Sequence, residues 1–189
     1  MPVQYTSIVQ EHQAVRNDVG IFDISHMGQL IVAATPSSRG EGAAATWLNT
    51  MLTNNVDKLD VGVGQYTFLL NERGGIIDDL IVYRIGDQKY LLVVNAARAD
   101  EDFSWLQKHN AGHASGLPDR GDRKRDACAT ILTNRSADFG GVAIQGPRIA
   151  ELFHALFGEN ADLPSRNSIA DLPFDGTTVS VARTGILCV

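Results

Sequence analysis

Two carboxylates interrupt an apolar run in the segment Asn71-Glu72-Arg73-Gly74-Gly75-Ile76-Ile77-Asp78-Asp79-Leu80-Ile81-Val82-Tyr83. Its β-branched residues predict a strand, and such a strand normally lies in a core, where an unpaired carboxylate is costly. Asp78 and Asp79 are adjacent, so an extended strand directs them to opposite faces. If one caps a turn or faces water, the other is directed toward the buried side and needs a partner, a proton or a ligand. The segment is therefore a candidate functional site.

The residues on either side of the two carboxylates predict neighbouring strands. Strands are expected over residues 66–70 and 76–84, and the glycine-containing loop 71–75 between them is consistent with a hairpin. A third strand is expected over residues 90–95, after a turn at 86–88. The two carboxylates would then lie near the start of the second strand in this series.

Helices and strands elsewhere follow no regular order. Helices are expected over residues 8–18, 43–51, 97–109 and 147–157, and further strands over 28–33, 128–132, 141–145 and 177–182. Turn-forming residues fill 34–42 and 110–127, and residues 162–175 read as irregular. Hairpins mixed with helices, without βαβ alternation, predict an α+β fold with antiparallel or mixed sheets and packed helices.

Two of these helices carry signals at their N-terminal ends. Pro147 opens the last helix, where proline suits the first turn. The helix over 97–109 has an apolar side made by Phe103, Trp105 and Leu106. Its first residues include three acids, which the helix dipole favours at that end: Asp100, Glu101 and Asp102.

Composition narrows the classes of partner. With 189 residues the chain fits one domain, or one and part of another, and its net charge of -6 argues against generic nucleic-acid binding. Cys128 and Cys188 lie far apart without CxxC spacing, which indicates reduced thiols and not a disulfide framework or a metal site. No apolar run approaches a membrane span, and the first residues lack a signal-peptide pattern. We therefore expect a cytoplasmic protein with no metal, membrane or nucleic-acid partner.

A second polar cluster consists of Asp23, Ser25 and His26. Residues this close in sequence seldom form a catalytic triad, whose members come from separate elements. The favoured interpretation is a buried hydrogen-bonded turn between a helix and a strand. The alternative is the wall of a pocket, with Met27 as adaptable apolar packing against a ligand.

The two aspartates also allow two interpretations. One is a β-turn cap together with a surface carboxylate. The other follows from strand parity, which places Asp79 on the same face as Ile81 and Tyr83. An aromatic side chain beside a carboxylate favours a ligand pocket, because tyrosine can both stack and form hydrogen bonds. Asp79 is therefore the better candidate to face a ligand, and Asp78 the better candidate for a structural role.

Several motifs occur in a fixed order along the chain. They are Met1-Pro2-Val3-Gln4-Tyr5, Glu11-His12-x-Ala14-Val15-Arg16, Phe22-Asp23-x-Ser25-His26-Met27-Gly28, Gly74-Gly75-x-x-Asp78-Asp79-Leu80, Val93-Val94-Asn95-Ala96 and Ile144-Gln145-Gly146-Pro147. With these motifs the chain resembles the aminomethyltransferase family, the T-protein of the glycine cleavage system. The resemblance extends over nearly the whole chain.

The resemblance implies an activity, a co-substrate and a partner. The family uses tetrahydrofolate to take a methylene group from an aminomethyl-lipoyl arm carried by the H-protein, with release of ammonia. By similarity, Asp79 is the catalytic carboxylate, which engages the pterin near the reacting nitrogen and assists proton movement. Positioned proton transfer contributes typically about 10²–10⁴-fold in rate. By the same similarity, the folate pocket is lined by Tyr66, Tyr83, Val93 and Asn95, with Met27 as a further contributor.

The chain also departs from the family pattern. Family members are considerably longer, and after Val181-Ala182-Arg183-Thr184-Gly185 this sequence reads Ile186-Leu187-Cys188-Val189 where the family has Tyr-Thr-Gly-Glu. We therefore expect residues 1–189 to be an incomplete folate-binding domain, truncated at both ends, with the C-terminal family domains absent. Folate contacts in the missing part would leave the site open to water, so we expect weak or no activity.

A different function within the same resemblance stays open. The chain could be a non-catalytic folate-binding module, related to iron–sulfur maintenance proteins or to the folate domain of demethylating oxidases. The iron–sulfur paralogues carry a Lys-Gly-Cys-Tyr motif that is not present in this sequence. The flavin-linked oxidases would need a large additional domain. A folding-deficient product without function is the third possibility.

Overall fold

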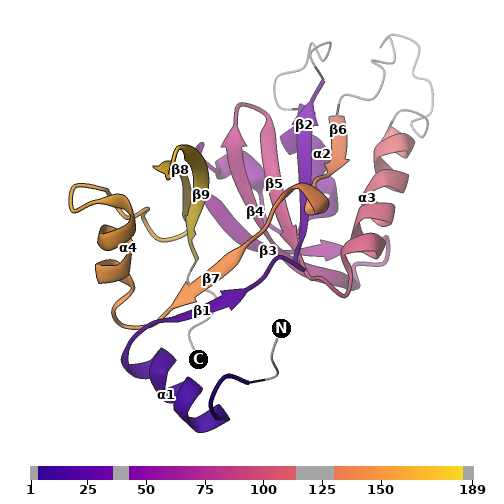
Figure 1. Cartoon of the computed structure of the whole chain (residues 1–189). Coiled ribbons are helices and arrows are strands. Elements are labelled where there is room, and N and C mark those ends of the chain that lie inside the picture. The colour runs from indigo at the N-terminus through magenta and orange to yellow at the C-terminus, as the bar shows by residue number, and fades with distance from the viewer. Residues whose placement is uncertain (1–3, 36–42, 114–129, 185–189) are drawn as a thin grey trace, which may run out of the picture.

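A computed structural model describes residues 4–35, 43–113 and 130–184 of the chain. The helices in these ranges are α1 (Ile8–Asn17), α2 (Ala43–Met51), α3 (Ala99–His113) and α4 (Ile149–Phe157), with the short 3-10 helices η1 (Val56–Lys58) and η2 (Ser136–Asp138). The strands are β1 (Gly20–Asp23), β2 (Gly28–Ala34), β3 (Gly64–Leu70), β4 (Ile76–Gly86), β5 (Lys89–Val94), β6 (Thr130–Asn134), β7 (Val142–Gln145), β8 (Ser168–Phe174) and β9 (Thr177–Arg183). Figure 1 shows their arrangement.

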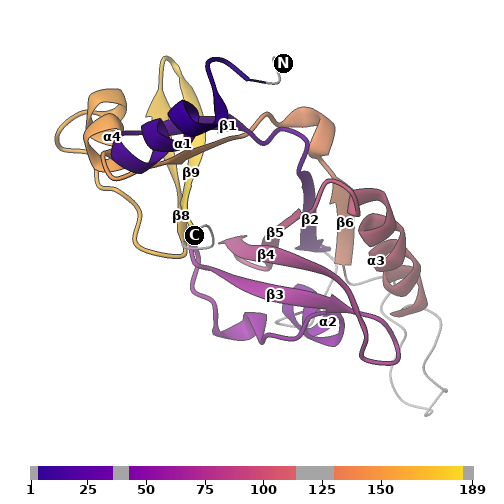
Figure 2. The same ribbon diagram turned by 90° about the horizontal axis from the view of Figure 1, so that it is seen from below.

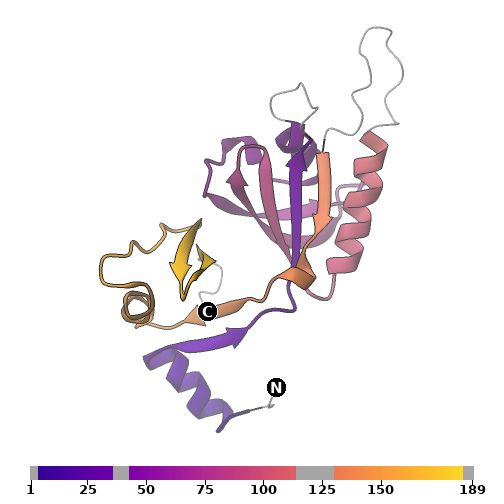
Figure 3. The ribbon, with the colours of Figure 1, turned by 45° about the horizontal axis from the view of Figure 1, so that its top comes forward.

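The strands form three antiparallel groups. The central sheet has the order β3-β4-β5-β2-β6, and β1 pairs with β7 and β8 with β9. The β1–β7 ladder connects the central sheet with the group formed by α1, α4 and the β8–β9 hairpin (Figures 2 and 3). The expectation of an α+β fold with antiparallel sheets is confirmed.

One face of the central sheet forms the hydrophobic core with α2, η1 and part of α3. Alternate residues of the strands point to this face, as the period of two requires. The fully buried members include Leu30 and Val32 of β2, Leu92 of β5, Trp47 of α2 and Leu106 of α3. Burying a side chain of this size contributes about 1.5–3 kcal/mol, so this face provides most of the apolar stabilisation in the described part of the chain.

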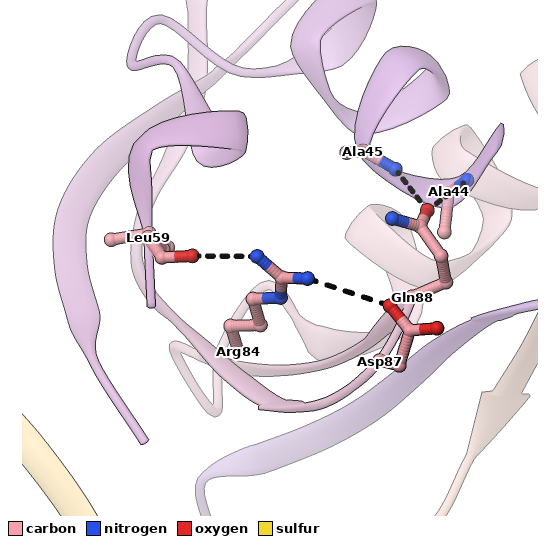
Figure 4. A network of polar contacts seen from close by, with 6 residues as sticks. All are labelled: Ala44, Ala45, Leu59, Arg84, Asp87 and Gln88. Atoms are coloured by element: carbon pink, nitrogen blue, oxygen red, sulfur yellow. Dashed lines mark hydrogen bonds and ion pairs between the residues drawn. The ribbon is translucent and has the colours of Figure 1, made fainter. Parts of the chain in front are cut away.

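The start of α2 is fixed to the sheet by one side chain of the β4–β5 turn, that of Gln88 (Figure 4). Oε1 of Gln88 accepts hydrogen bonds from the backbone N–H groups of Ala44 and Ala45, at 3.2 and 3.5 Å. Helix N-termini leave such donors without partners inside the helix, so Gln88 acts as a cap from a distant segment. In the same network, the guanidinium of Arg84 donates to the carbonyl of Leu59 at 2.9 Å.

The opposite face of the central sheet has less cover. Tyr66 of β3 is 39% exposed and Ile131 of β6 is 47% exposed, although both are apolar or aromatic residues of the sheet. Register places Phe68 opposite Asp79, and Tyr66 opposite Ile81, on this face. The face that carries Asp79 is therefore both apolar and accessible.

Several expectations from the sequence were wrong or incomplete. Pro147 does not open the last helix, because α4 begins at Ile149 and Arg148 is its N-cap residue. Residues 162–175 are not irregular throughout, because Ser168–Phe174 forms β8 and pairs with β9. The strand β1 was not expected, and the expected strand at 128–132 is β6, Thr130–Asn134. Residues 128–129, Cys128 among them, and also Cys188 lie outside the described residues.

The expected hydrogen-bonded turn is present, between β1 and β2. It was expected to be buried, but its residues Asp23, Ser25 and His26 are exposed. The backbone N–H of Ser25 donates to Oδ1 of Asp23 at 2.9 Å, and its Oγ accepts from the N–H of Gly141 at 3.1 Å. The hydrogen bond from the Ser25 backbone lowers the pKa of Asp23. These contacts account for the cluster as a turn that links β1 to the segment before β7.

Candidate functional site

Strand β4 separates the two aspartates as strand geometry requires. Asp78 points toward the core side, with Leu80 and Val82, and is only 7% exposed. Asp79 points to the accessible face and is half-buried. The turn before β4 is capped by a different residue, because Oδ1 of Asn71 accepts from the backbone N–H groups of Arg73 and Gly75, each at 2.9 Å. The interpretation of the pair as a turn cap plus a surface carboxylate is therefore wrong.

Asn95, which directly follows β5, connects the two aspartates. Its backbone N–H and side-chain Nδ2 donate to the carboxylate of Asp78, at 3.2 and 2.9 Å. The same Nδ2 lies 2.9 Å from the carbonyl oxygen of Asp79 and 3.2 Å from its Oδ1. An amide has only two N–H bonds, so three acceptors require one of them to be shared. We call this arrangement of Asp78, Asn95 and Asp79 the aspartate clamp.

Tyr66 holds the other side of the Asp79 carboxylate. Its hydroxyl donates to Oδ2 of Asp79 at 2.7 Å, and this hydrogen bond raises the pKa of Tyr66. The ring of Tyr66 packs edge-on against Phe68, with centroids 5.4 Å apart. Both oxygens of the Asp79 carboxylate are therefore oriented by the protein, one from β3 and one from the end of β5.

A third carboxyl group lies behind the clamp. Asp102 of α3 is fully buried, and neither of its carboxyl oxygens receives a hydrogen bond from the described residues. Burial raises the pKa of Asp102 to about 8, and its interaction with Asp78 acts in the same direction. A buried carboxyl group beside another carboxylate is expected to retain its proton.

A small pocket of about 200 Å³ opens beside Tyr66, between β3, β4 and the segment that precedes β8. It is lined by Gly64, Gln65, Tyr66, Ile81, Tyr83, Arg166, Asn167 and Thr184. Tyr83 is 3% exposed, and burial raises the pKa of its hydroxyl to about 12. The ring of Tyr83 packs directly over Gly64, where a Cβ would lie 2.3 Å from Cδ1 of the ring. The pocket is smaller than a typical ligand pocket.

The structure brings together some of the site residues expected from the sequence. Asp79, Tyr66 and Asn95 are joined by hydrogen bonds, and Tyr66 and Tyr83 line the pocket. Val93 pairs with Ile81 of β4 and lies one strand away.

Met27 immediately precedes Gly28, which pairs with Val94. Met27 therefore lies at the same end of the sheet as Asn95. Of the site residues expected from the sequence, only Tyr66 and Tyr83 line the pocket, and Asp79, Asn95, Met27 and Val93 do not.

Asp102 was not singled out as a site residue from the sequence. In the sequence it is one of three acids near a helix N-terminus. The structure distinguishes it, because Asp100 and Glu101 are exposed and Asp102 is buried. One signal was available: Asp102 precedes Leu106 by four residues and so shares the apolar side of the helix.

Two general features of the described residues bear on the class of site. In the ranges 4–35, 43–113 and 130–184, no three or more His, Cys, Asp or Glu side chains are grouped so that they could hold a metal ion. No helix in these ranges has the length and apolar content needed to cross a membrane. The polar groups of the candidate site are carboxylates, an amide and tyrosine hydroxyls, which suit hydrogen bonding and proton transfer to an organic ligand.

Known proteins with related sequences are aminomethyltransferases. The chain is 41% identical over 187 residues to the aminomethyltransferase of Prosthecochloris aestuarii, which covers 98% of this chain and 46% of that protein. It is 43% identical over 156 residues to the aminomethyltransferase of Staphylococcus haemolyticus, covering 82% of this chain and 37% of that protein. The chain thus spans about half the length of the relatives that it matches, or less.

Two solved structures have the same fold as this chain. The glycine cleavage system aminomethyltransferase T from Bartonella henselae superposes with a TM-score of 0.71 at 28% identity, over 98% of this chain and 44% of that one. Heterotetrameric sarcosine oxidase from Corynebacterium sp. U-96 shares the fold, with a TM-score of 0.55 at 19% identity over 94% of this chain and 78% of that one. The family model of the GCVT N-terminal domain matches residues 1–186. By sequence and by fold, this chain belongs to the family of the GCVT N-terminal domain.

Proposed function

We propose that this chain binds tetrahydrofolate on the accessible face of its central sheet and takes part in aminomethyl transfer in the glycine cleavage system. The observation that carries the proposal is the Asp79 carboxylate. It is half-buried on an apolar face, and Tyr66 and Asn95 orient its two oxygens at 2.7 and 3.2 Å. A positioned carboxylate of this kind can accept hydrogen bonds from the N–H donors of a pterin and move a proton.

Each of the other residues has a proposed part in the same site. The rings of Tyr66 and Tyr83 offer aromatic surface beside the pocket, on which a flat heterocycle can stack. Asn95 orients Asp79 from the opposite side. Val93 and Met27 contribute apolar surface toward the β2–β5 side of the same sheet face. No metal takes part in this proposal.

The complete reaction needs a partner. We propose that a lipoylated H-protein presents its aminomethyl group to the folate, and that a methylene unit passes to tetrahydrofolate while ammonia leaves. Asp79 is proposed as the catalytic carboxylate, because a group fixed next to the reacting nitrogen can hold the proton that the transfer displaces. Support comes from the relatives: two are aminomethyltransferases, and the solved protein from Bartonella henselae is the aminomethyltransferase T of the glycine cleavage system.

Calorimetric titration of the chain with tetrahydrofolate tests the binding part. We expect binding by the unchanged chain, and a loss of at least about tenfold in affinity for Asp79→Ala and Asp79→Asn, because each removes the charged acceptor. Asp87→Asn is the matched control, since the Asp87 side chain is 93% exposed beyond the other end of β4. Equal affinities for the chain and Asp79→Asn would exclude Asp79 as the folate-binding carboxylate.

A transfer assay with aminomethylated H-protein tests the catalytic part. Folate-dependent release of ammonia that disappears in Asp79→Asn would support aminomethyl transfer by this chain. Folate binding without any ammonia release would support the alternative of a non-catalytic folate-binding module. Absence of binding in a folded chain would contradict both proposals.

A further inference from the structure

The buried carboxyl group of Asp102 has no part in the proposed chemistry, yet it lies directly behind the aspartate clamp. Among the described residues it is the only buried carboxyl group whose two oxygens both lack a hydrogen-bond donor. An ionised carboxylate in such a place is costly, and a protein normally avoids it by supplying a partner or a proton. This residue therefore requires an explanation beyond helix formation.

Packing at the start of α3 fixes the position of Asp102. The guanidinium of Arg98 donates to the carbonyl of Ile77, one residue before Asp78, at 3.1 Å. Gly28 of β2 lies so close to Ala99 that a Cβ at Gly28 would stand 2.8 Å from that of Ala99. The first turn of α3 is thus held against the ends of β2 and β4, with Asp102 directed into the interior.

The charged groups that face Asp102 lie on β4, on α3 and at the residue just before α3. Asp78 of β4 raises its pKa, as does Glu101 of α3, whereas Arg98 lowers it. Arg98 is also paired with Glu101 at 2.9 Å, so its charge is shared. The N-terminal end of a helix favours a negative charge, but this effect is small beside the cost of a buried unpaired carboxylate.

The two interacting carboxyl groups have unequal surroundings. Asp78 accepts two hydrogen bonds from Asn95, from the backbone N–H and from Nδ2, which stabilise its ionised form. Asp102 receives none. When two carboxyl groups share a site, the proton resides on the one whose charged form is less stabilised, which here is Asp102.

We propose that Asp102 is a positioning residue: a neutral carboxylic acid that donates its O–H to Asp78 and thereby fixes the Asp78–Asn95 arrangement that orients Asp79. Asp102 does not itself reach the accessible face. Its effect on a ligand rests on the proposed folate function, whereas its effect on the clamp does not. The chain of contacts runs from Asp102 through Asp78 and Asn95 to Asp79.

Carbon-13 NMR of the ligand-free chain tests the clamp. The side-chain carbonyl carbon of Asn95 and the carboxyl carbon of Asp78 should shift with an inflection near pH 8, as Asp102 loses its proton. In Asp102→Asn, which is neutral at every pH and keeps a donor, the inflection should be absent. Asp100→Asn, an exposed neighbour on α3, should retain it.

Two results would overturn the proposal. One is an Asp102 carboxyl carbon that titrates below about pH 5, which would make this group ionised at neutral pH. The other is an unchanged inflection of Asn95 in Asp102→Asn. Asp102→Asn decides these outcomes, because it is uncharged and keeps a hydrogen-bond donor at this position.

A second measurement connects the clamp to the ligand. If only the neutral form of Asp102 supports binding, tetrahydrofolate should bind about tenfold more weakly at pH 9 than at pH 7, because about one molecule in ten then keeps the proton. Asp102→Asn should bind equally at both values. Equal weakening in both proteins would contradict the positioning role. Absence of binding at either pH would contradict the proposed function. The NMR titration would still show whether Asp102 positions the aspartate clamp.

Discussion

The phenolic oxygen of Tyr66 lies 2.7 Å from Oδ2 of Asp79, diagonally across the β3–β4 ladder. Tyr66 pairs with Ile81, and Asp79 with Phe68, so the two residues are diagonal neighbours on one face. Asn95 holds the other oxygen of the same carboxylate from the end of β5, at 3.2 Å. One carboxylate is thus oriented from two neighbouring strands, which limits the directions from which it can bind a ligand.

Replacement of Tyr66 by phenylalanine should affect ligand binding more than stability. The hydroxyl is lost, but the packing of the ring against Phe68 is kept. A hydrogen bond at a residue that is 39% exposed contributes about 1 kcal/mol or less to folding, since water can replace the lost partner. Because Asp79 loses one of its two orienting contacts, we expect tetrahydrofolate affinity to fall about 3–10-fold. Urea unfolding and calorimetric titration measure the two effects.

The same hydrogen bond can be followed without a ligand. It raises the pKa of Tyr66, so replacement of the charged acceptor by a neutral amide in Asp79→Asn should bring the ionisation of one tyrosine to lower pH. Ultraviolet absorbance of phenolate measures this change directly. Tyr83, whose pKa burial raises to about 12, should titrate unchanged and serves as the internal control. Identical titration curves for the two proteins would contradict the Tyr66–Asp79 hydrogen bond in solution.

Stability should fall as pH rises through the neutral range because of Asp102. Its pKa is about 8 in the folded chain, above the ordinary value of 3.8 expected on unfolding. Between these values the folded chain keeps a proton that the unfolded chain releases, so raising the pH favours unfolding, with a limiting slope of about 1.4 kcal/mol per pH unit. The stabilising contribution is therefore complete below about pH 4 and is lost as pH rises to about 8.

Urea unfolding of the chain and of Asp102→Asn between pH 5 and 8 tests whether stability falls as pH rises. The free energy of unfolding should decrease with pH in the unchanged chain and remain flatter in the variant. Asp23, whose pKa is lowered, has the opposite dependence, but it acts at more acidic pH and does not interfere in this window. Parallel curves for the two proteins would show that Asp102 does not cause the pH dependence of the free energy of unfolding.

Gly64 should tolerate no side chain while Tyr83 remains in place. A Cβ at Gly64 would lie 2.3 Å from Cδ1 of the Tyr83 ring, which is buried and cannot move aside freely. Overpacking of this kind costs about 1–3 kcal/mol, so Gly64→Ala should be destabilised by that amount in urea unfolding. Gly86→Ala is the matched control, because its nearest neighbour is Lys89 Cβ at an ordinary 3.6 Å. An equal loss in both variants would exclude the contact with Tyr83 as the cause.

The β3–β4 hairpin was predictable because its determinants are local. Residues 71–75 contain Asn71 and two glycines, and Asn71 caps the turn through its own Oδ1. The alternation of residues in β4 likewise assigns Asp78 and Asp79 to opposite faces from sequence alone. That same pattern could not identify the partners, since Tyr66, Asn95 and Asp102 reach these carboxylates only after distant strands and α3 have packed.

Two strands outside the central sheet, β1 and β8, were not predicted because they bury little. All their residues are half-buried or exposed, so an apolar pattern that marks a core strand is weak there. A local signal was nevertheless present. Asp175 and Gly176 both have positive φ, at 45° and 74°, which is the geometry that an Asp-Gly hairpin turn prefers.

Gly146 should be the most sensitive glycine of the β1–β7 region. It has a φ of +142°, and a Cβ there would lie 2.1 Å from the backbone oxygen of Asp18. Backbone cannot move aside as a side chain can, and the unusual φ adds conformational strain, so Gly146→Ala should lose at least about 2 kcal/mol of stability. Because the contact joins the segments that flank one end of the β1–β7 ladder, hydrogen exchange should accelerate in β1 and β7 while tetrahydrofolate affinity stays unchanged. Gly158→Ala isolates the conformational part, since Gly158 has a φ of +96° but no atom within 4 Å of the position that a Cβ would take. Equal losses in the two variants would assign the whole effect to backbone conformation and none to the contact with Asp18.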